Sequence, residues 1–153
     1  MKPFTLDEKD REVLRLLIED GRISSTEIAR RIPNLTERAA RYRINKLIDN
    51  EVITIRAIVD PRQLGYSVTA DVWMAVNPAQ VREVSEKLTN LPRVTYVAHS
   101  FGDQDVIIQV VARDVDDLHT YLTEVIGKIS GVQRTNTYII KKLKEIHDWF
   151  LTE

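Results

Sequence analysis

Apolar residues recur at helical spacing in three short runs within the first sixty positions, and this spacing predicts three helices. The first helix begins at a capping box that runs from Thr5 to Glu8, and it ends at Gly21. The second helix begins at Ser24, which opens another capping box, and it ends before Pro33. The apolar face of the first helix consists of Val13, Leu14, Leu17 and Ile18.

The third predicted helix follows Thr36, a residue that can accept a hydrogen bond from an early backbone N–H group. Steps of about 100° per residue place four apolar residues on one face. These residues are Ala40, Ile44, Leu47 and Ile48. The same steps direct Arg38, Tyr42, Asn45 and Lys46 away from that face, and they place Arg41 and Arg43 on its flanks.

A β-branched run over residues 52–59 predicts an extended ribbon after the third helix. Helix, helix, short turn, helix and ribbon, in this order, are typical of a winged helix-turn-helix domain. We therefore expect such a domain over residues 1–60. A short hinge over residues 61–65 follows, because Pro61 and Gly65 favour a turn there.

In the second half of the chain, the apolar residues change from helical spacing to every second position. Every second residue from Val68 to Val76 is apolar, which predicts a half-buried strand with Trp73 on its other face. Asn77 and Pro78 predict the start of a helix. Strands over residues 94–101, 106–112 and 131–142 and a helix over residues 114–127 complete the order β-α-β-β-α-β. The fold class is therefore α+β, with a ferredoxin-like βαββαβ domain and a C-terminal tail over residues 66–153.

Composition narrows the function classes. The chain has 153 residues and no cysteine, which excludes disulfides and thiol chemistry. Its net charge is −1, yet residues 22–46 hold seven basic residues against two acidic ones. A confined basic segment in an otherwise neutral chain is typical of a surface for an anionic partner, and equally of a solvated helix face. Because the segment coincides with the predicted helix-turn-helix, double-stranded DNA is the partner we expect.

Catalytic and metal sites are not expected. The three histidines are far apart in the sequence, and no pair of them has the spacing of metal ligands. No glycine-rich phosphate loop or nucleophile elbow occurs, so we expect no enzyme, no metal and no cofactor. No apolar run approaches the ~18 residues of a spanning helix, and the acidic N-terminus is unlike a signal peptide. We expect a cytoplasmic protein without a membrane partner.

The outward face of the third helix has the chemistry for reading DNA. Arginine can bond guanine through two atoms, and hydroxyl groups at a helix start suit phosphate oxygens. The predicted DNA-binding residues are Ser24, Ser25, Thr26, Thr36, Arg38, Arg41, Tyr42, Asn45 and Arg56.

Several motifs, taken in order, resemble the leucine-responsive regulatory protein family (Lrp/AsnC). In the first half these are residues 6–14, 20–24, 27–29, 43–47 and 52–53. In the second half they are residues 64–65, 102–105 and 131–137. The resemblance implies a transcription regulator whose C-terminal domains pair into dimers through their sheets, with dimers gathering into assemblies such as octamers.

The resemblance also implies an amino acid or related metabolite bound between dimers, near the loop after the second strand of the C-terminal domain. Carried onto this chain, it predicts Gly102, Asp103 and Asp105 as effector-binding residues, with Thr135 and Thr137 as further candidates. A dimer with two reading helices predicts a roughly palindromic operator.

Two other interpretations stay open: an architectural DNA-binding protein that needs no ligand, and a metabolite-binding assembly module. Contacts to phosphate alone weaken uniformly with salt, whereas base reading leaves a preference for one sequence over another. That difference separates an architectural protein from a sequence-specific regulator.

Overall fold

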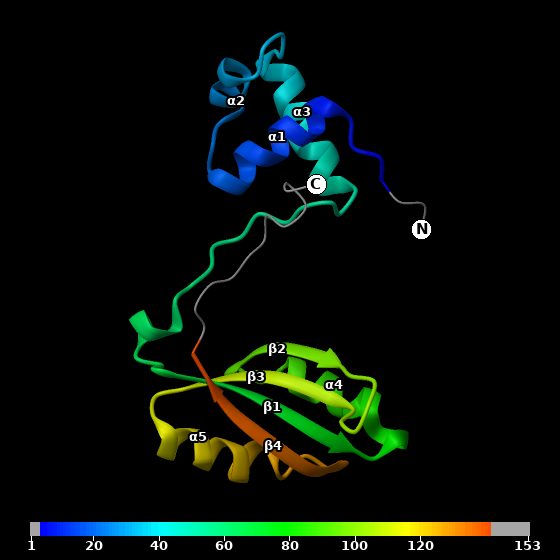
Figure 1. Cartoon of the computed structure of the whole chain (residues 1–153), viewed down its shortest axis with the longest axis vertical. Helices are drawn as coiled ribbons and strands as arrows, with labels where there is room; N and C mark the ends of the chain where they lie inside the picture. Colours follow the sequence, from blue (N-terminus) through cyan, green and yellow to red (C-terminus); the bar gives the residue numbers. More distant parts are fainter. Residues whose placement is uncertain (1–3, 142–153) are drawn as a thin grey trace. The chain divides into compact units, whose positions relative to one another are not determined.

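The computed structural model describes residues 4–141. These residues divide into two compact units, one ending at Ile58 and the other beginning at Val59 (Figure 1). The predicted C-terminal tail lies outside the described residues.

Three helices form the N-terminal unit: α1 (Glu8–Glu19), α2 (Ser25–Arg31) and α3 (Glu37–Asp49). Their apolar faces meet in a small core of Val13, Leu14, Leu17, Ile28, Ile32, Ala40 and Leu47. The three helices and their apolar spacing are therefore confirmed. Two predicted core residues are not buried, since Ile18 is 37% exposed and Ile48 is 41% exposed. Each stands at the edge of its helix's apolar face.

The cap of α1 differs from the prediction. Asp7, rather than Thr5, caps the helix, because Asp7 Oδ1 accepts a hydrogen bond from the Asp10 N–H group at 2.7 Å. Asp10 reciprocates through Oδ2, which accepts from the Asp7 N–H group at 3.3 Å. The capping box is thus shifted by two residues and built from two aspartates. Glu27 does not close the second box either, since its carboxylate accepts hydrogen bonds from Arg30 and Arg31.

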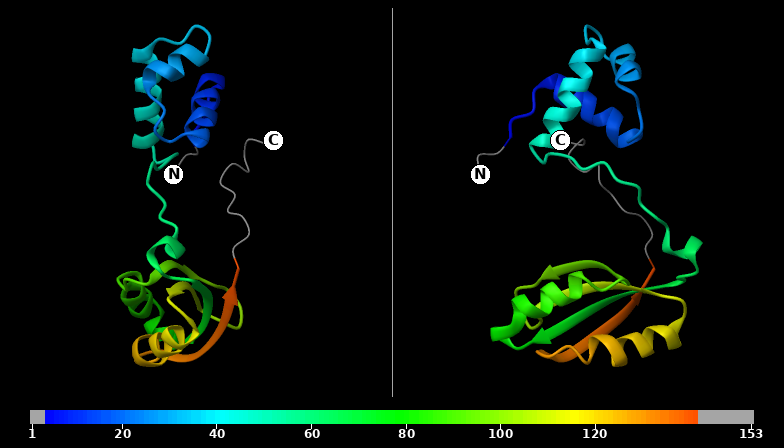
Figure 2. Two further views of the ribbon diagram at one scale, coloured as in Figure 1. Left: turned by 90° about the vertical axis from the view of Figure 1, so that its left-hand side faces the viewer. Right: turned by 180° about the vertical axis from the view of Figure 1, so that it is seen from behind.

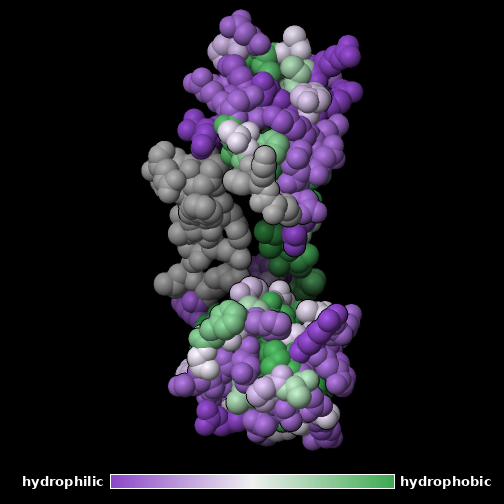
Figure 3. Space-filling view, turned by 90° about the vertical axis from the view of Figure 1, so that its right-hand side faces the viewer, coloured by the Kyte–Doolittle hydropathy of each residue, from purple (hydrophilic) through white to green (hydrophobic). Residues whose placement is uncertain are grey.

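The predicted ribbon over residues 52–59 is wrong for the residues that the structure describes. No strand forms there. The N–H groups of Val52 and Ile53 turn back to the Leu47 carbonyl oxygen, at the end of α3. Beyond them the segment is extended but exposed, and a β-branched sequence cannot form a ladder without a partner strand. Figure 3 shows hydrophobic residues along the segment that joins the units. Ile58, which belongs to this segment, is 71% exposed.

The C-terminal unit opens with a short 3₁₀ turn, Pro61–Leu64. Its antiparallel sheet has the order β2-β3-β1-β4, formed by β1 (Val68–Val76), β2 (Val94–His99), β3 (Val106–Ala112) and β4 (Val132–Ile140). The helices are α4 (Val81–Thr89) and α5 (Val115–Tyr121), which continues through a π-helical turn to Ile126. The ferredoxin-like order is confirmed, with β2 two residues shorter than predicted.

Both helices cover the same face of the sheet (Figure 2). Between that face and the helices lies one aliphatic core, centred on Val72, Met74, Ile108 and Val110. Gly131 closes the turn before β4 with φ +102°, and its carbonyl oxygen accepts from the Asn77 N–H group at 2.8 Å. A Cβ atom at this position would lie 3.0 Å from both the Gln80 and Val84 side chains. No helix among residues 4–141 covers the other face of the sheet, which we call the bare face.

Candidate nucleic-acid interface and effector loop

Helix α3 presents a polar face to solvent. Arg38, Tyr42 and Asn45 are exposed, with Tyr42 at 68% of its surface. The face exists because Ala40 and Leu47 are fully buried on the opposite side of the helix. Four of the predicted DNA-binding residues, counting Arg41, therefore share one exposed helix surface.

The predicted phosphate-binding hydroxyl groups lie at helix starts. Ser24 Oγ caps α2 by accepting from the Glu27 N–H group at 3.1 Å. Thr36 Oγ1 caps α3 by accepting from the Ala39 N–H group at 3.2 Å. Each hydroxyl keeps its own O–H to donate. Thr26 is exposed, Ser25 is half-buried, and Arg56 is exposed in the extended segment after α3.

The basic segment over residues 22–46 carries less free charge than its composition indicates. Arg30 and Arg31 pair with Glu27, and hydrogen bonds from these arginines lower the pKa of Glu27 to about 2. Arg41 pairs with Glu37 at 2.8 Å, although both side chains stay largely exposed. Exposed pairs of this kind are weak and can be exchanged for phosphate contacts.

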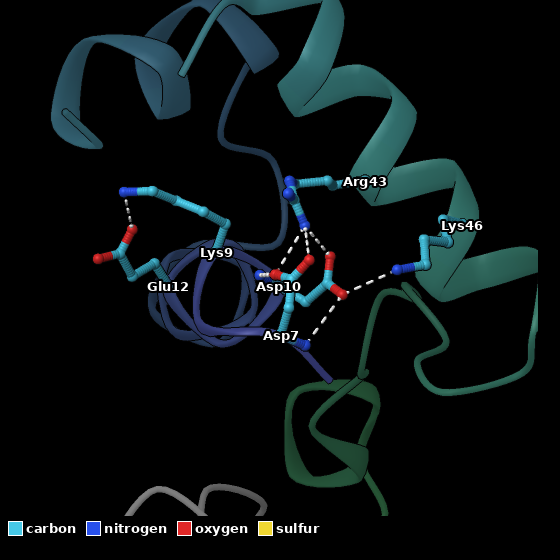
Figure 4. Close-up of polar contacts among 6 residues, drawn as sticks. All are labelled: Asp7, Lys9, Asp10, Glu12, Arg43 and Lys46. Atoms are coloured by element: carbon cyan, nitrogen blue, oxygen red, sulfur yellow. Dashed lines mark hydrogen bonds and ion pairs between the residues drawn. The ribbon is translucent and has the colours of Figure 1, made fainter. Parts of the chain in front are cut away.

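Two further cations of α3 are held by the first helix (Figure 4). Arg43 Nη1 donates to Asp7 Oδ2 at 2.7 Å and to Asp10 Oδ1 at 2.5 Å. Lys46 Nζ donates to Asp10 Oδ2 at 2.9 Å. The Asp10 side chain is fully buried, while those of Arg43 and Lys46 are 22% and 29% exposed. The prediction that Lys46 points away from the core is therefore wrong, because the buried Asp10 carboxylate attracts it.

The electrostatics of this cluster favour the ionised carboxylates. Burial raises the pKa of Asp10, but the hydrogen bonds from Lys46 and Arg43 outweigh it, and the pKa lies below its usual value. The hydrogen bond from Arg43 likewise holds the pKa of Asp7 below its usual value. The pattern of helix faces did not find this cluster. The signal for it was acidic residues at positions 7 and 10, since position 10 falls beside the apolar run of α1.

The predicted effector loop connects β2 to β3. Gly102 and Asp103 are exposed at its tip. Asp105 is engaged by the sheet: its N–H donates to the Met74 carbonyl oxygen at 2.8 Å, and its Oδ2 accepts from the Val76 N–H group at 2.8 Å. Asp105 therefore fixes the loop to the end of β1.

The structure brings Thr135 to the same end of the sheet, because it pairs with Met74 in the β1–β4 ladder. Thr137 pairs with Val72 and lies two residues farther along the strand. Sequence reasoning did not select Gln104, yet its Oε1 is buried and has no hydrogen-bond partner among the described residues. A buried acceptor without a donor is costly, which makes Gln104 a candidate for binding a ligand donor.

Other kinds of site find no support in the described part of the chain. No group of three or more His, Asp or Glu residues is placed there to hold a metal ion. Nor does any helix between residues 4 and 141 have the length and apolarity needed to cross a membrane.

Comparison with known sequences gives matches in both halves. A family model described as the Lrp/AsnC ligand binding domain matches residues 69–147, and a model described as winged helix-turn-helix DNA-binding matches residues 6–54. An uncharacterised HTH-type transcriptional regulator of Pyrococcus abyssi is 41% identical over 92% of this chain and 89% of its own length. The HTH-type transcriptional regulator FL11 of Pyrococcus horikoshii is 34% identical over 90% of each chain.

Solved structures share the fold of this chain. The structure of E. coli AsnC has a TM-score of 0.85 at 27% identity, covering 94% of this chain and 97% of AsnC. A transcriptional regulator from Neisseria meningitidis, solved as a complex with L-Met, has a TM-score of 0.84 at 21% identity. That match covers 93% of this chain and 94% of the neighbour, and it supports the fold.

Proposed function

We propose, from the premise that this chain belongs to the Lrp/AsnC family of helix-turn-helix transcriptional regulators, that it reads a DNA sequence with helix α3. In this proposal residues 1–60 bind DNA, residues 61–65 form the hinge, and residues 66–153 bind an effector and assemble the protein. The observation that carries the proposal is that Arg38, Tyr42 and Asn45 are exposed on one face of α3. On the opposite face, Ala40 and Leu47 are buried in the core of the unit.

Base reading requires side chains that reach the major groove while the helix itself stays fixed. Arg38 and Arg41 supply guanidinium groups that can bond guanine at two atoms, and Asn45 can do the same for adenine. Ser24, Ser25, Thr26 and Thr36 lie at or beside helix starts, where hydroxyl groups suit phosphate. In this proposal, Arg56 contacts the phosphate backbone of the DNA.

The proposed effector is an amino acid or a related metabolite. The Neisseria neighbour, solved with L-Met, motivates this ligand class. Gly102 leaves the loop backbone open to close approach, the Asp103 carboxylate can pair with an α-ammonium group, and the unpartnered Gln104 Oε1 can accept from it. Asp105 and Thr135 would hold the loop and line the end of the sheet, with Thr137 beyond them.

We further propose that the bare face of the sheet is where two copies pair. Trp73, Tyr96 and Tyr138 lie on this face and are 36%, 56% and 58% exposed. Exposed aromatic residues grouped on one sheet face are typical of a subunit interface. A two-fold dimer would carry two α3 helices and favour a roughly palindromic operator, and dimers would gather into larger assemblies such as octamers.

The test is a selection of binding sites from random duplexes, run with and without a pool of free amino acids. We expect one enriched and roughly palindromic sequence, and an affinity for it that changes with the amino acids. Arg38→Ala and Arg41→Ala should each weaken binding to the enriched duplex at least tenfold, corresponding to about 1.4 kcal/mol. Arg82→Ala, on an exposed α4 side chain, is the charge-matched control and should not weaken it.

Failure to enrich any sequence would favour the architectural alternative, in which contacts to phosphate alone hold the DNA. Unchanged affinity in both arginine variants would contradict the placement of the reading helix. An affinity that no amino acid changes would remove the effector from the proposal and leave the DNA-binding part standing. We propose no catalytic role and a cytoplasmic location for this regulator, since its relatives are transcriptional regulators.

A further inference from the structure

Three side chains form one row along α3. Arg38, Tyr42 and Lys46 are spaced four residues apart, so they lie one above another on the helix surface. The first two are exposed, whereas Lys46 is bound to Asp10 of α1 at 2.9 Å and lies over the Phe4 ring at 5.0 Å. Arg38 and Tyr42 therefore have no side-chain hydrogen bond or ion pair with another residue of the described range 4–141, whereas Lys46 is held by Asp10.

Residues of α1 contact α3 (Figure 4) and also the turn before it. Asp10 accepts from Arg43 and Lys46, which are three residues apart on α3. The adjacent residue, Lys9, donates to the Pro33 carbonyl oxygen at 3.1 Å, in the turn between α2 and α3. Hydrogen bonds from charged groups are directional, so this arrangement fixes both the start and the rotation of α3.

We propose that Asp10 is a positioning residue for DNA reading, which holds Lys46 away from the phosphate backbone and orients α3 through Lys46 and Arg43. This inference rests on the proposed function. Asp10 itself is fully buried and so does not touch DNA. It acts through the two cations that it binds.

The physical consequence concerns how the protein discriminates between sequences. Each cation that meets a phosphate adds affinity for any DNA and adds about 0.9 to the slope of log affinity against log salt. Holding Lys46 on Asp10 removes such a contact from the row and leaves Arg38 and Tyr42 to contact bases. Holding Lys46 therefore lowers binding to all DNA alike, whereas the orientation of α3 that Asp10 fixes favours the preferred sequence alone.

The experiment uses the full chain and two duplexes of equal length: the sequence enriched by the selection above, and a scrambled version of it. Affinity is measured between 50 and 200 mM salt for the wild type, Asp10→Asn and Glu8→Gln. Asp10→Asn keeps the side-chain shape but frees Lys46. Glu8→Gln removes the same charge from an exposed position on the same helix, where it forms no ion pair with another described residue.

For Asp10→Asn we expect a salt slope steeper by about 0.9, so that affinity falls about 3.5-fold more than the wild type's over this salt range. Affinity for the scrambled duplex should rise several-fold at low salt, and the ratio between the two duplexes should fall. Glu8→Gln should keep the wild-type slope and ratio. A purely structural role for Asp10 would reduce the folded fraction, lowering both affinities equally without changing the slope.

A second variant keeps the test decisive if Asp10→Asn does not fold. Asp10→Leu combined with Lys46→Met replaces the ion pair by apolar side chains, a change that buried pairs often tolerate. It should keep a slope no steeper than the wild type's, because the lysine is gone.

An unchanged slope and duplex ratio in Asp10→Asn would overturn the inference while leaving the proposed function intact. So would a steeper slope in the double variant. Equal wild-type affinity for both duplexes would overturn the proposed function, and the inference with it.

Discussion

The two units of this chain are held together in different ways. In the C-terminal unit, thirteen buried residues form one cluster between the sheet and its helices, and all of them are apolar or aromatic. In the N-terminal unit, seven buried apolar residues form the cluster, and beside them lies the buried carboxylate of Asp10 with its two cations. The smaller unit thus relies on charged contacts where the larger relies on packing.

The difference bears on what each unit must do. Apolar burial is non-directional and stabilises whatever arrangement fills space well. An ion pair with hydrogen bonds fixes distances and angles, and it costs desolvation to form. A three-helix unit that presents one helix to DNA gains from fixed orientation, whereas a sheet unit gains from a large core.

The largest expected effect is in the sheet core. Ile108→Ala should lower the free energy of unfolding of the C-terminal unit by about 4 kcal/mol, because the removed methyl groups leave a cavity in a fully buried site. The measurement is amide hydrogen exchange followed residue by residue. Ile139→Ala, at an isoleucine that is 56% exposed in the same sheet, should change stability by less than about 0.5 kcal/mol. A similar loss in both variants would contradict a packing-based unit.

Next in size is the loss of the buried carboxylate. Asp10→Ala should lower the free energy of unfolding of the N-terminal unit by about 3 kcal/mol, since Arg43 and Lys46 lose their buried partner. Exchange in β1 and β3 should stay at wild-type rates. Asp49→Ala, an exposed residue at the end of α3, is the matched control. Equal exchange in the Asp10 and Asp49 variants would mean that the charged cluster adds no stability.

Acid should destabilise the N-terminal unit more than the C-terminal unit. The effect should be smaller than in the two variants above, because only part of the carboxylate population is protonated at moderate pH. The pKa values of Asp7, Asp10 and Glu27 lie below their usual values in the N-terminal unit, and those of Asp60, Glu83 and Asp117 do so in the C-terminal unit. Among these six, Asp10 is the fully buried carboxylate, so its protonation is the most damaging. Their contribution to stability is therefore complete above pH about 5, beyond the unfolded pKa values, and is lost as pH falls through the folded pKa values. NMR spectra recorded from about pH 6 to about pH 2.5 should show N-terminal signals changing first. Simultaneous loss of both units would refute the contrast.

The smallest expected effect is at the start of the reading helix. Thr36→Ala removes the cap on the Ala39 N–H group and should cost the N-terminal unit about 1 kcal/mol. Thr36→Ser keeps the hydroxyl and should restore most of that stability. Exchange rates in the first turn of α3 report the difference, and an alanine variant with wild-type rates there would show that the cap is dispensable.

Periodicity sufficed for most of the fold. The alternation from Val68 to Val76 and the apolar run of β3 gave the strand positions, because a side chain's face follows directly from its place in the period. The ribbon over residues 52–59 was wrong because β-branched composition describes a preference, whereas a ladder needs a partner strand.

The candidate site was harder to predict, because the positions of its side chains depend on contacts with residues that are distant in the sequence. A helical wheel places the outward residues of α3 correctly for Arg38 and Tyr42, which carry no buried partner among the described residues. It fails for Lys46, whose position is decided by Asp10, thirty-six residues earlier in the chain. Likewise, the orphaned Gln104 Oε1 depends on how the loop folds against the sheet, which local sequence does not encode.

The turn glycines set different limits on how this sequence can vary. At Gly131 a positive φ and the Gln80 and Val84 side chains at 3.0 Å act together, so every single-nucleotide missense change at that codon introduces a crowded residue. At Gly65, φ is +84°, but no atom of the residues that the structure describes would lie within 4 Å of a Cβ atom, and asparagine is an acceptable replacement there. We therefore expect homologues to carry other residues at position 65. At position 131 we expect a substitution only together with a change in α4.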